Sequence, residues 1–279
     1  MANYTAADIK ALRERTGAGM LDVKKALDEA DGDADKALEI IRVKGLKGVS
    51  KREGRAASDG LVAAHVADDA AGQTGVLIEL NSETDYVAKN DRFIALAEKV
   101  LAAAVATGTD DVATVLAADA DGSTVQETID ETAATLGEKV VLRRVVRVSA
   151  EKVAVYLHKV NKDLPPQVGV LVGSDAAGAE VARDVAMHIA AYSPTYLTRD
   201  DVPAETVEAE RRIAEETSRN EGKPEAALPK IVEGRLNGFF KESVLVDQAF
   251  AKDPKKTVAQ VLSEVGGTVT GFARFRVGA

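Results

Sequence analysis

The chain has 279 residues, of which 46% are hydrophobic and only 4% aromatic, and its formal net charge is −9. It has no cysteine, which excludes disulfide bonds, thiol nucleophiles and cysteine-ligated zinc or iron–sulfur sites. No apolar run reaches the ~18 residues of a membrane-spanning helix, and the acidic balance argues against direct nucleic-acid binding as the main role. Because the N-terminus lacks the apolar segment of a secretory signal, we expect a cytoplasmic protein.

The first 45 residues predict a bundle of three short helices. Apolar residues recur at helical spacing over Ala6–Arg15, Met20–Ala30 and Ala34–Val43. Gly17-Ala18-Gly19 provides a sharp turn after the first helix, and Gly45 is expected to end the third. A bundle of this size lies close to the lower limit for independent folding, and we expect it to bind another protein.

Residues 46–58 predict a linker in which basic side chains are mixed with glycines. The basic residues are Lys47, Lys51, Arg52 and Arg55, and the glycines are Gly48 and Gly54. Such a composition is typical of flexible, solvated chain. We therefore predict a basic hinge between two domains rather than a nucleic-acid patch.

Residues 60–192 contain two copies of a unit made of a β-hairpin and a helix. The predicted strands and helices are Leu61–Val66, Val76–Leu80 and Phe93–Val105 in the first copy, and Val153–Val160, 169–172 and Glu180–Ala191 in the second. Both second strands begin with Gly-Val-Leu. From this strand to the helix, Val76 to Val100 spans nine residues more than Val170 to Val185 (24 − 15). The connection between the second strand and the helix is therefore longer in the first copy than in the second.

The lengthened connection contains the segment Thr84–Asn90. It places a carboxylate, Asp85, beside an aromatic ring, Tyr86, between a buried strand and an amphipathic helix. A ring and a carboxylate held on a turn between rigid elements suit a probe for another molecule's surface. The alternative, which the local pattern leaves open, is that Tyr86 folds back over the protein's own core.

Between the two copies, helices are predicted over Val112–Leu116 and Thr124–Leu136 and a strand over Lys139–Val148. Apolar and basic residues alternate along this strand, as on a sheet with one face in water. Its arginines are therefore expected to form a solvated face rather than a ligand clamp; they are Arg143, Arg144 and Arg147.

The last third of the chain begins with two long polar helices, predicted over Glu205–Ser218 and Glu225–Lys241. Their short connection indicates an antiparallel helical hairpin that projects from the body. A helix over Thr257–Val265 and a strand over Thr268–Val277 close the chain. The predicted parts are a bundle (1–45), a linker (46–58), a core N-subdomain (59–149), a core C-subdomain (150–200 and 243–279) and the hairpin insertion (201–242).

The patterns that usually accompany catalysis are missing. The sequence has neither a Gly-x-x-x-x-Gly-Lys-Ser/Thr phosphate loop nor a Gly-x-Gly-x-x-Gly segment after a strand. The histidines, His65, His158 and His188, have no company at metal-ligand spacing, and each is predicted to be partly buried and structural. We therefore expect no enzyme, no cofactor and no metal site.

Several segments together resemble the bacterial translation elongation factor Ts family. In chain order they are Leu12–Met20, Lys24–Leu27, Thr84–Asn90, Met187–Ala190, Val232–Arg235 and Thr270–Phe275. They span nearly the whole chain in the family's order. The resemblance implies an α+β fold with a ubiquitin-associated-like three-helix bundle, a core of two related hairpin-plus-helix subdomains with antiparallel sheets, and an inserted helical hairpin.

The resemblance also implies a function. Members of this family are guanine-nucleotide exchange factors of elongation factor Tu, which they bind in its GDP-bound and nucleotide-free states. The segment Thr84-Asp85-Tyr86-Val87 corresponds to the one that displaces Mg²⁺ from the partner. Contact with the partner is implied for Arg13, Met20, Leu21 and His158.

Two departures from the family pattern stand out. Tyr86 replaces the usual phenylalanine and adds a hydroxyl, and the chain ends at Ala279, without the C-terminal helical extension of some members. Two alternatives remain open at this point. Met20 and Leu21 can belong to the core of the bundle, and the chain can be an adaptor whose bundle binds ubiquitin-like or chaperone-like proteins without exchange activity.

Overall fold

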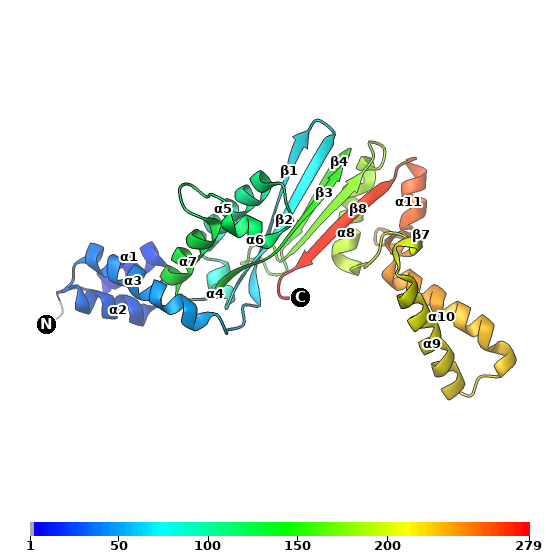
Figure 1. The fold of residues 1–279 in the computed structure, drawn as a ribbon, viewed down its shortest axis with the longest axis horizontal. Helices are drawn as coiled ribbons and strands as arrows, with labels where there is room; N and C mark the ends of the chain where they lie inside the picture. Colours follow the sequence, from blue (N-terminus) through cyan, green and yellow to red (C-terminus); the bar gives the residue numbers. More distant parts are fainter. Residues whose placement is uncertain (1–2) are drawn as a thin grey trace.

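The computed structural model describes residues 3–279, and its N-terminal part is a bundle of three helices, α1 (Ala6–Thr16), α2 (Met20–Glu29) and α3 (Ala34–Arg52) (Figure 1). A capping box begins α1, because Thr5 and Asp8 exchange side-chain and backbone hydrogen bonds. Gly17 ends α1 in a left-handed conformation (φ 71°). The bundle interior is made of Leu12, Ala18, Val23, Ala26, Leu27, Ala30, Ala37 and Ile41.

The third helix is longer than the sequence predicts. It continues through Gly45 to Arg52 and packs against α7 (Val125–Leu136) of the core. A Cβ atom at position 45 would overlap the carbonyl oxygen of Ala134, so this glycine permits two helices to approach closely. The prediction that Gly45 ends the helix is wrong. The first part of the predicted hinge is helical, and only residues 53–58 connect α3 to the sheet.

The core consists of two antiparallel sheets, each covered by helices on its outer face (Figure 1). The first has the order β1-β2-β3 (Asp59–Asp69, Gly72–Ser82, Val140–Ala150) and carries α5 (Asp91–Thr107), α6 (Val112–Ala117) and α7. The second has the order β4-β5-β8 (Lys152–His158, Val168–Ser174, Val269–Arg276) and carries α8 (Ala179–Tyr192) and α11 (Val258–Glu264). This arrangement confirms the predicted α+β fold and its two hairpin-plus-helix units.

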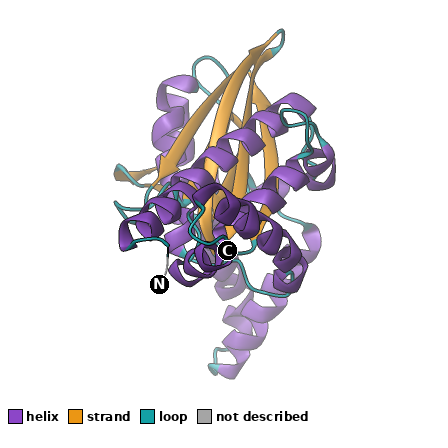
Figure 2. Ribbon diagram, turned by 90° about the vertical axis from the view of Figure 1, so that its left-hand side faces the viewer, coloured by secondary structure: helices purple, strands orange, loops and turns teal. Residues whose placement is uncertain are grey.

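The inner faces of the two sheets pack on each other, so that the strands lie between two helical layers (Figure 2). The repeated Gly-Val-Leu segments meet at this interface. A Cβ atom on Gly75 would lie 3.1 Å from Leu171 Cδ2, and one on Gly169 would lie 2.6 Å from Leu77 Cδ1. Each glycine thus makes room for the leucine of the other copy. Because side chains alternate along a strand, the neighbouring valines of both segments face the helices.

A buried ion pair within the first sheet is bonded to the segment that follows the last strand of the second sheet. The carboxylate of Glu79 is fully buried and accepts hydrogen bonds from Arg144 Nε (2.7 Å) and from the backbone N–H of Gly278 (3.0 Å). Arg147 Nη1 donates to the carbonyl of Ala104 (3.1 Å). The prediction of a solvated arginine face is therefore wrong for Arg144 and Arg147, whereas Arg143 is exposed. A buried carboxylate needs such partners, and here they come from the first sheet and from the segment after β8.

The helical hairpin consists of α9 (Ala204–Asn220) and α10 (Leu228–Ser243) and extends away from the core (Figure 1). Its small interior is formed by Ala214, Val232 and Leu236, with Phe240 packed beside them. Three 3-10 turns (Arg199–Asp201, Glu225–Ala227 and Leu245–Asp247) and a short ribbon of β6 (Ala249–Phe250) and β7 (Asp253–Thr257) complete the described elements. Within residues 3–279, no helix has the length and apolar character needed to cross a membrane.

Candidate functional site

The segment Thr84–Asn90 forms a turn with one short helix, α4 (Asp85–Ala88), between β2 and α5. Thr84 is its N-cap residue, and its hydroxyl oxygen accepts a hydrogen bond from the backbone N–H of Val87 (3.4 Å). Asn90 in turn caps α5 through a bond from the N–H of Arg92 (2.9 Å). Asp85 and Tyr86 are therefore the first two residues of a helix that is held at both ends. We call residues 84–88 the probe turn.

Burial divides the probe turn into two sides. Thr84, Asp85 and Tyr86 are exposed, with Tyr86 47% exposed, whereas Val87 is only 2% exposed and belongs to the core of the first subdomain. The alternative in which Tyr86 covers the protein's own core is therefore wrong. The buried side chain of Val87 holds the turn against the core, whereas the ring of Tyr86 projects into solvent.

The base of the probe turn is fastened to the start of β3 by a reciprocal arrangement of hydrogen bonds. The backbone N–H of Thr84 donates to Glu138 Oε2 (3.0 Å), and its hydroxyl donates to Glu138 Oε1 (2.6 Å). The backbone N–H of Lys139 donates to Glu83 Oε1 (2.7 Å). We call these four residues the clasp. Sequence reasoning missed it, because no local pattern links Thr84 to a glutamate 54 positions away.

The ring of Tyr86 is linked to the helical bundle. Arg13 Nη2 donates to the Tyr86 hydroxyl (2.7 Å), and the guanidinium carbon lies 5.6 Å from the ring centroid. Lys89 Nζ lies 6.0 Å from the same centroid. Two cations therefore flank the ring, which is favourable for an aromatic face. The hydroxyl that distinguishes Tyr86 from phenylalanine thus connects the bundle to the core.

Further contacts hold the bundle against the probe turn. Arg92 donates to the carbonyl of Arg15, and a Cβ atom on Gly17 would lie 2.9 Å from Asn90 Nδ2. Arg42 of α3 pairs with Glu131 of α7. The loop that follows α1 therefore lies directly beside the residue that caps α5.

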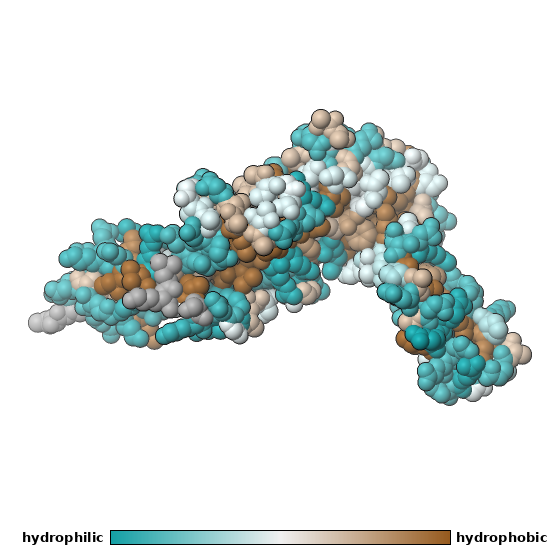
Figure 3. Space-filling view, viewed as in Figure 1, coloured by the Kyte–Doolittle hydropathy of each residue, from teal (hydrophilic) through white to brown (hydrophobic). Residues whose placement is uncertain are grey.

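Met20 and Leu21 begin α2 just after this loop and point outward. Their side chains are 59% and 71% exposed, so the alternative that places them in the bundle core is wrong. The view in Figure 3 shows apolar surface on the bundle and on the adjoining core among hydrophilic residues. Two adjacent apolar side chains at the beginning of a helix offer a compact contact surface.

His158 ends β4 in the second subdomain and is exposed. Its Nδ1 atom forms a hydrogen bond with the Tyr156 hydroxyl (3.1 Å). The adjacent loop reaches the first sheet, since the backbone N–H of Val62 donates to the carbonyl of Pro166 (2.9 Å). His158 thus lies at the same end of the sandwich as the probe turn, although no hydrogen bond in the described part of the chain joins the two.

The other two histidines occupy opposite environments. His65 is exposed, whereas His188 is fully buried and stacks on Tyr192. Burial lowers the pKa of His188, while its hydrogen bond with Gln248 (2.9 Å) acts in the opposite direction. The prediction of partial burial is therefore wrong for all three histidines, because His65 and His158 are exposed and His188 is fully buried. Residues 3–279 contain no cluster of histidine, aspartate or glutamate arranged to hold a metal ion.

Comparison with known proteins gives one consistent result. The model of a family described as elongation factor TS matches residues 83–279. A protein named elongation factor Ts from Beutenbergia cavernae is 73% identical over 281 residues, and one from Micrococcus luteus is 68% identical over 281 residues. The protein of the same name from Kineococcus radiotolerans is 59% identical over 279 residues. In each case the match covers 100% of both chains.

Proposed function

The chain belongs to the elongation factor Ts family, and on that premise we propose that it is a guanine-nucleotide exchange factor for elongation factor Tu. It binds the GDP-bound partner, promotes the release of GDP and stabilises the nucleotide-free partner until GTP enters. The observation that carries the proposal is the exposed Asp85–Tyr86 pair on a turn held at both ends. In this role the chain makes and breaks no covalent bond.

The probe turn acts on the metal ion of the partner. Mg²⁺ demands near-ideal octahedral geometry, so small displacements of its ligands weaken its binding. The ring of Tyr86 enters between elements of the partner and shifts those ligands. Asp85 accepts hydrogen bonds from backbone N–H groups that the shift leaves free. Thr84 and Val87 hold the pair in place, through the N-cap and through the core.

The energetics require a second contact surface. Accelerating release about ten-thousand-fold requires roughly 5.5 kcal/mol of differential stabilisation. Burying the exposed half of one aromatic ring covers about 100 Å² and contributes roughly 2.5 kcal/mol. Complete burial of a methionine or leucine side chain contributes about 1.5–3 kcal/mol. Met20 and Leu21, with Arg13 beside them, therefore form the second surface, which promotes exchange by fitting the nucleotide-free partner better than the GDP-bound one. His158 forms a third surface on the other subdomain.

Exchange by this route is reciprocal. The factor weakens nucleotide binding by the same free energy by which the nucleotide weakens binding of the factor. Added GDP with Mg²⁺, or GTP with Mg²⁺, is therefore expected to dissociate the complex. An adaptor that recognises the partner without exchange would show no such coupling.

The test removes the side chains of Asp85 and Tyr86 and leaves the rest of the probe turn unchanged. We expect Asp85→Ala with Tyr86→Ala to slow GDP release from elongation factor Tu at least about a hundredfold, because both side chains that displace the metal are lost. Stopped-flow release of fluorescent GDP at saturating factor measures the rate. Asp110→Ala, which removes an exposed carboxylate elsewhere in the same subdomain, is the control.

The outcomes separate the two functions. Both side chains are exposed, so the variant is expected to keep the circular dichroism and urea unfolding of the wild type. A wild-type rate in the double variant contradicts the proposed site. Binding of the partner by the wild-type protein with no acceleration of release favours the adaptor instead.

A further inference from the structure

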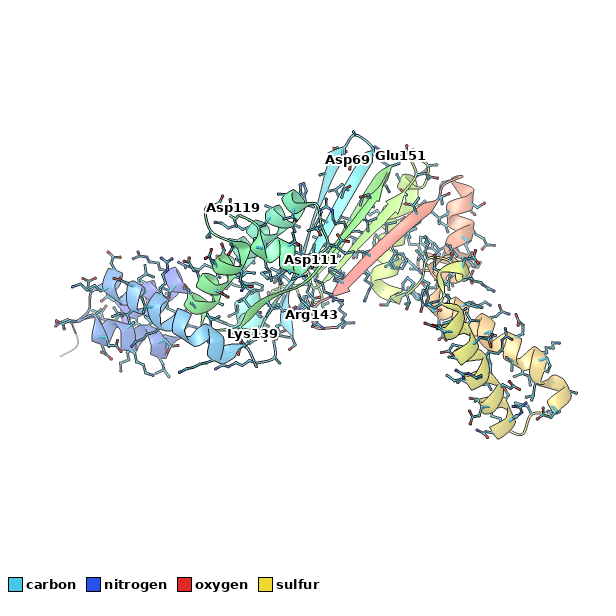
Figure 4. All side chains as sticks on the ribbon, viewed as in Figure 1. Asp69, Asp111, Asp119, Lys139, Arg143 and Glu151 are labelled. Atoms are coloured by element: carbon cyan, nitrogen blue, oxygen red, sulfur yellow. The ribbon has the colours of Figure 1, made fainter. Side chains whose placement is uncertain are left out.

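Glu138 of the clasp is held on a short, rigid connection. Gly137 ends α7 in a left-handed conformation (φ 80°), and β3 begins at Val140. Lys139 is fixed as well, since its Nζ atom donates to the carbonyl of Arg55 (3.0 Å). In Figure 4, Lys139 lies at the end of the strands opposite Asp69 and Glu151, which is the end at which β2 passes into the probe turn. The Glu138 carboxylate is therefore a fixed point beside that turn.

The helix that carries Asp85 and Tyr86 has only four residues. A helix this short has little stability of its own, because helix formation requires a costly nucleus. Its direction therefore depends on what holds it. Val87 fixes one side in the core, and Thr84 fixes the beginning. Two of the bonds that hold Thr84 end on Glu138.

The placement of Glu138 is unfavourable for a carboxylate apart from these bonds. It is half-buried, and burial raises its pKa even though the hydrogen bonds from Thr84 act in the opposite direction. Glu127 provides a comparison within the same subdomain. It accepts the same two donors from Thr124, the backbone N–H (2.8 Å) and the hydroxyl (3.1 Å), but it is exposed and caps α7.

We propose that Glu138 is a positioning residue for nucleotide exchange. Through Thr84 it fixes the direction in which Asp85 and Tyr86 project toward the partner. Glu138 acts without touching the partner or the nucleotide. This inference rests on the proposed function, because it assigns the residue a part in the same site.

The variant Glu138→Gln tests the inference with little change in shape. An amide offers one acceptor oxygen and one NH₂ group, so the Thr84 hydroxyl must turn from donor to acceptor and both bonds to a charged carboxylate are lost. Misplacement of a reacting group by about 1 Å can cost a hundredfold in rate. We expect GDP release at saturating Glu138→Gln to be about tenfold slower than with the wild type. Glu127→Gln, which makes the same change from carboxylate to amide at an exposed capping residue away from the probe turn, is expected to stay within about twofold.

A second experiment shows whether Glu138 acts through the probe turn. In the background Asp85→Ala with Tyr86→Ala, we expect Glu138→Gln to change the rate by less than about twofold, since the groups that it positions are gone. A further tenfold loss in that background would show a general structural effect and overturn the inference. Amide hydrogen exchange of residues 84–90 is expected to be faster in Glu138→Gln than in Glu127→Gln.

Failure of the inference is distinguishable from failure of the proposed function. If the wild-type protein does not accelerate GDP release, the proposed function is wrong. If it does, and Glu138→Gln matches it, only the positioning role is wrong. Should Glu138→Gln not fold, Glu138→Asp, whose shorter side chain cannot reach both Thr84 donors, takes its place with the same expectations.

Discussion

Tyr86 shows how one atom can connect two parts of a chain. Its ring is exposed, and its hydroxyl accepts a hydrogen bond from Arg13, 73 positions away. The two residues, which the family resemblance assigns to different contacts with the partner, are therefore neighbours in the free protein. Such a bond between exposed groups contributes little to stability. Its consequence is geometric, because it sets the distance between the bundle surface and the probe turn.

His188 is a buried titratable residue whose hydrogen bonds depend on its ionisation state. Its Nδ1 atom accepts a hydrogen bond from the backbone N–H of Ala251 (3.1 Å), so Nε2 carries the proton and donates to Gln248. This pattern requires a neutral ring. Burial lowers the pKa of His188 below 6.5, so protonation must break the pattern or occur in the unfolded chain.

The pH dependence of stability follows from this depressed pKa. Above the unfolded pKa of about 6.5, His188 is neutral in both the folded and the unfolded chain. Its protonation therefore does not lower the free energy of unfolding in this range. Below it the unfolded chain binds a proton that the folded chain does not, so this free energy falls by up to about 1.4 kcal/mol per pH unit until the folded pKa is reached. Urea unfolding at pH 7.5 and 5.5 measures the loss.

Two variants isolate the contribution of His188. We expect His188→Gln to be less stable than the wild type at pH 7.5 but to lose less between the two pH values. His65→Gln removes an exposed histidine and is expected to follow the wild type. Equal losses in all three proteins would show that His188 does not titrate with folding.

Among the elements, α3 shows why a glycine is an ambiguous signal. In the sequence, Gly45 follows a helical pattern and precedes a basic, glycine-rich segment, which is typical of a helix end. In the structure it lies where α3 meets α7, and its lack of a side chain lets the backbones approach. Local sequence cannot distinguish these roles, because the second depends on a helix about 90 positions later.

The two roles of glycine predict that alanine substitutions change the free energy of unfolding in opposite directions. Gly45→Ala is expected to lower the free energy of unfolding by about 1–3 kcal/mol, because the added methyl group overpacks the contact with α7. Gly234→Ala lies within α10, where a Cβ atom would meet nothing within 4 Å. It is expected to raise this free energy by about 0.5–1 kcal/mol through helix propensity. Urea unfolding checks both, and a stabilising Gly45→Ala would contradict the close crossing.

Elements with strong periodicity could be predicted, and contacts between distant segments could not. The strand β2 and the helix α5 follow from a branched apolar run and an apolar stripe. The ribbon of β6 and β7 was missed, since β6 has two residues and β7 contains a proline and two lysines. For Tyr86, the sequence left two alternatives open, an exposed ring and a ring packed over the protein's own core. The clasp depends on tertiary structure alone.

At the scale of the whole molecule, the surfaces assigned to the partner lie on the bundle and on one end of the core. The hairpin of α9 and α10 extends from the other subdomain (Figure 1). The bundle is held to the core by a helix crossing, an ion pair and the Arg13–Tyr86 bond rather than by a flexible hinge. In the proposed function, the partner therefore meets surfaces whose spacing is already set, which reduces the entropy lost on binding.

The position of β8 has a consequence for the way this protein is made. This strand supplies one edge of the second sheet, and Gly278 reaches the buried carboxylate of Glu79 in the first. During synthesis the bundle and the first sheet emerge before β8, so we expect the sandwich to close only once Val269–Arg276 has left the ribosome. We expect chains stalled before Val269 to resist protease over 59–149 and to be cleaved within 150–200. Equal protection of both segments in such nascent chains would show that closure does not require β8.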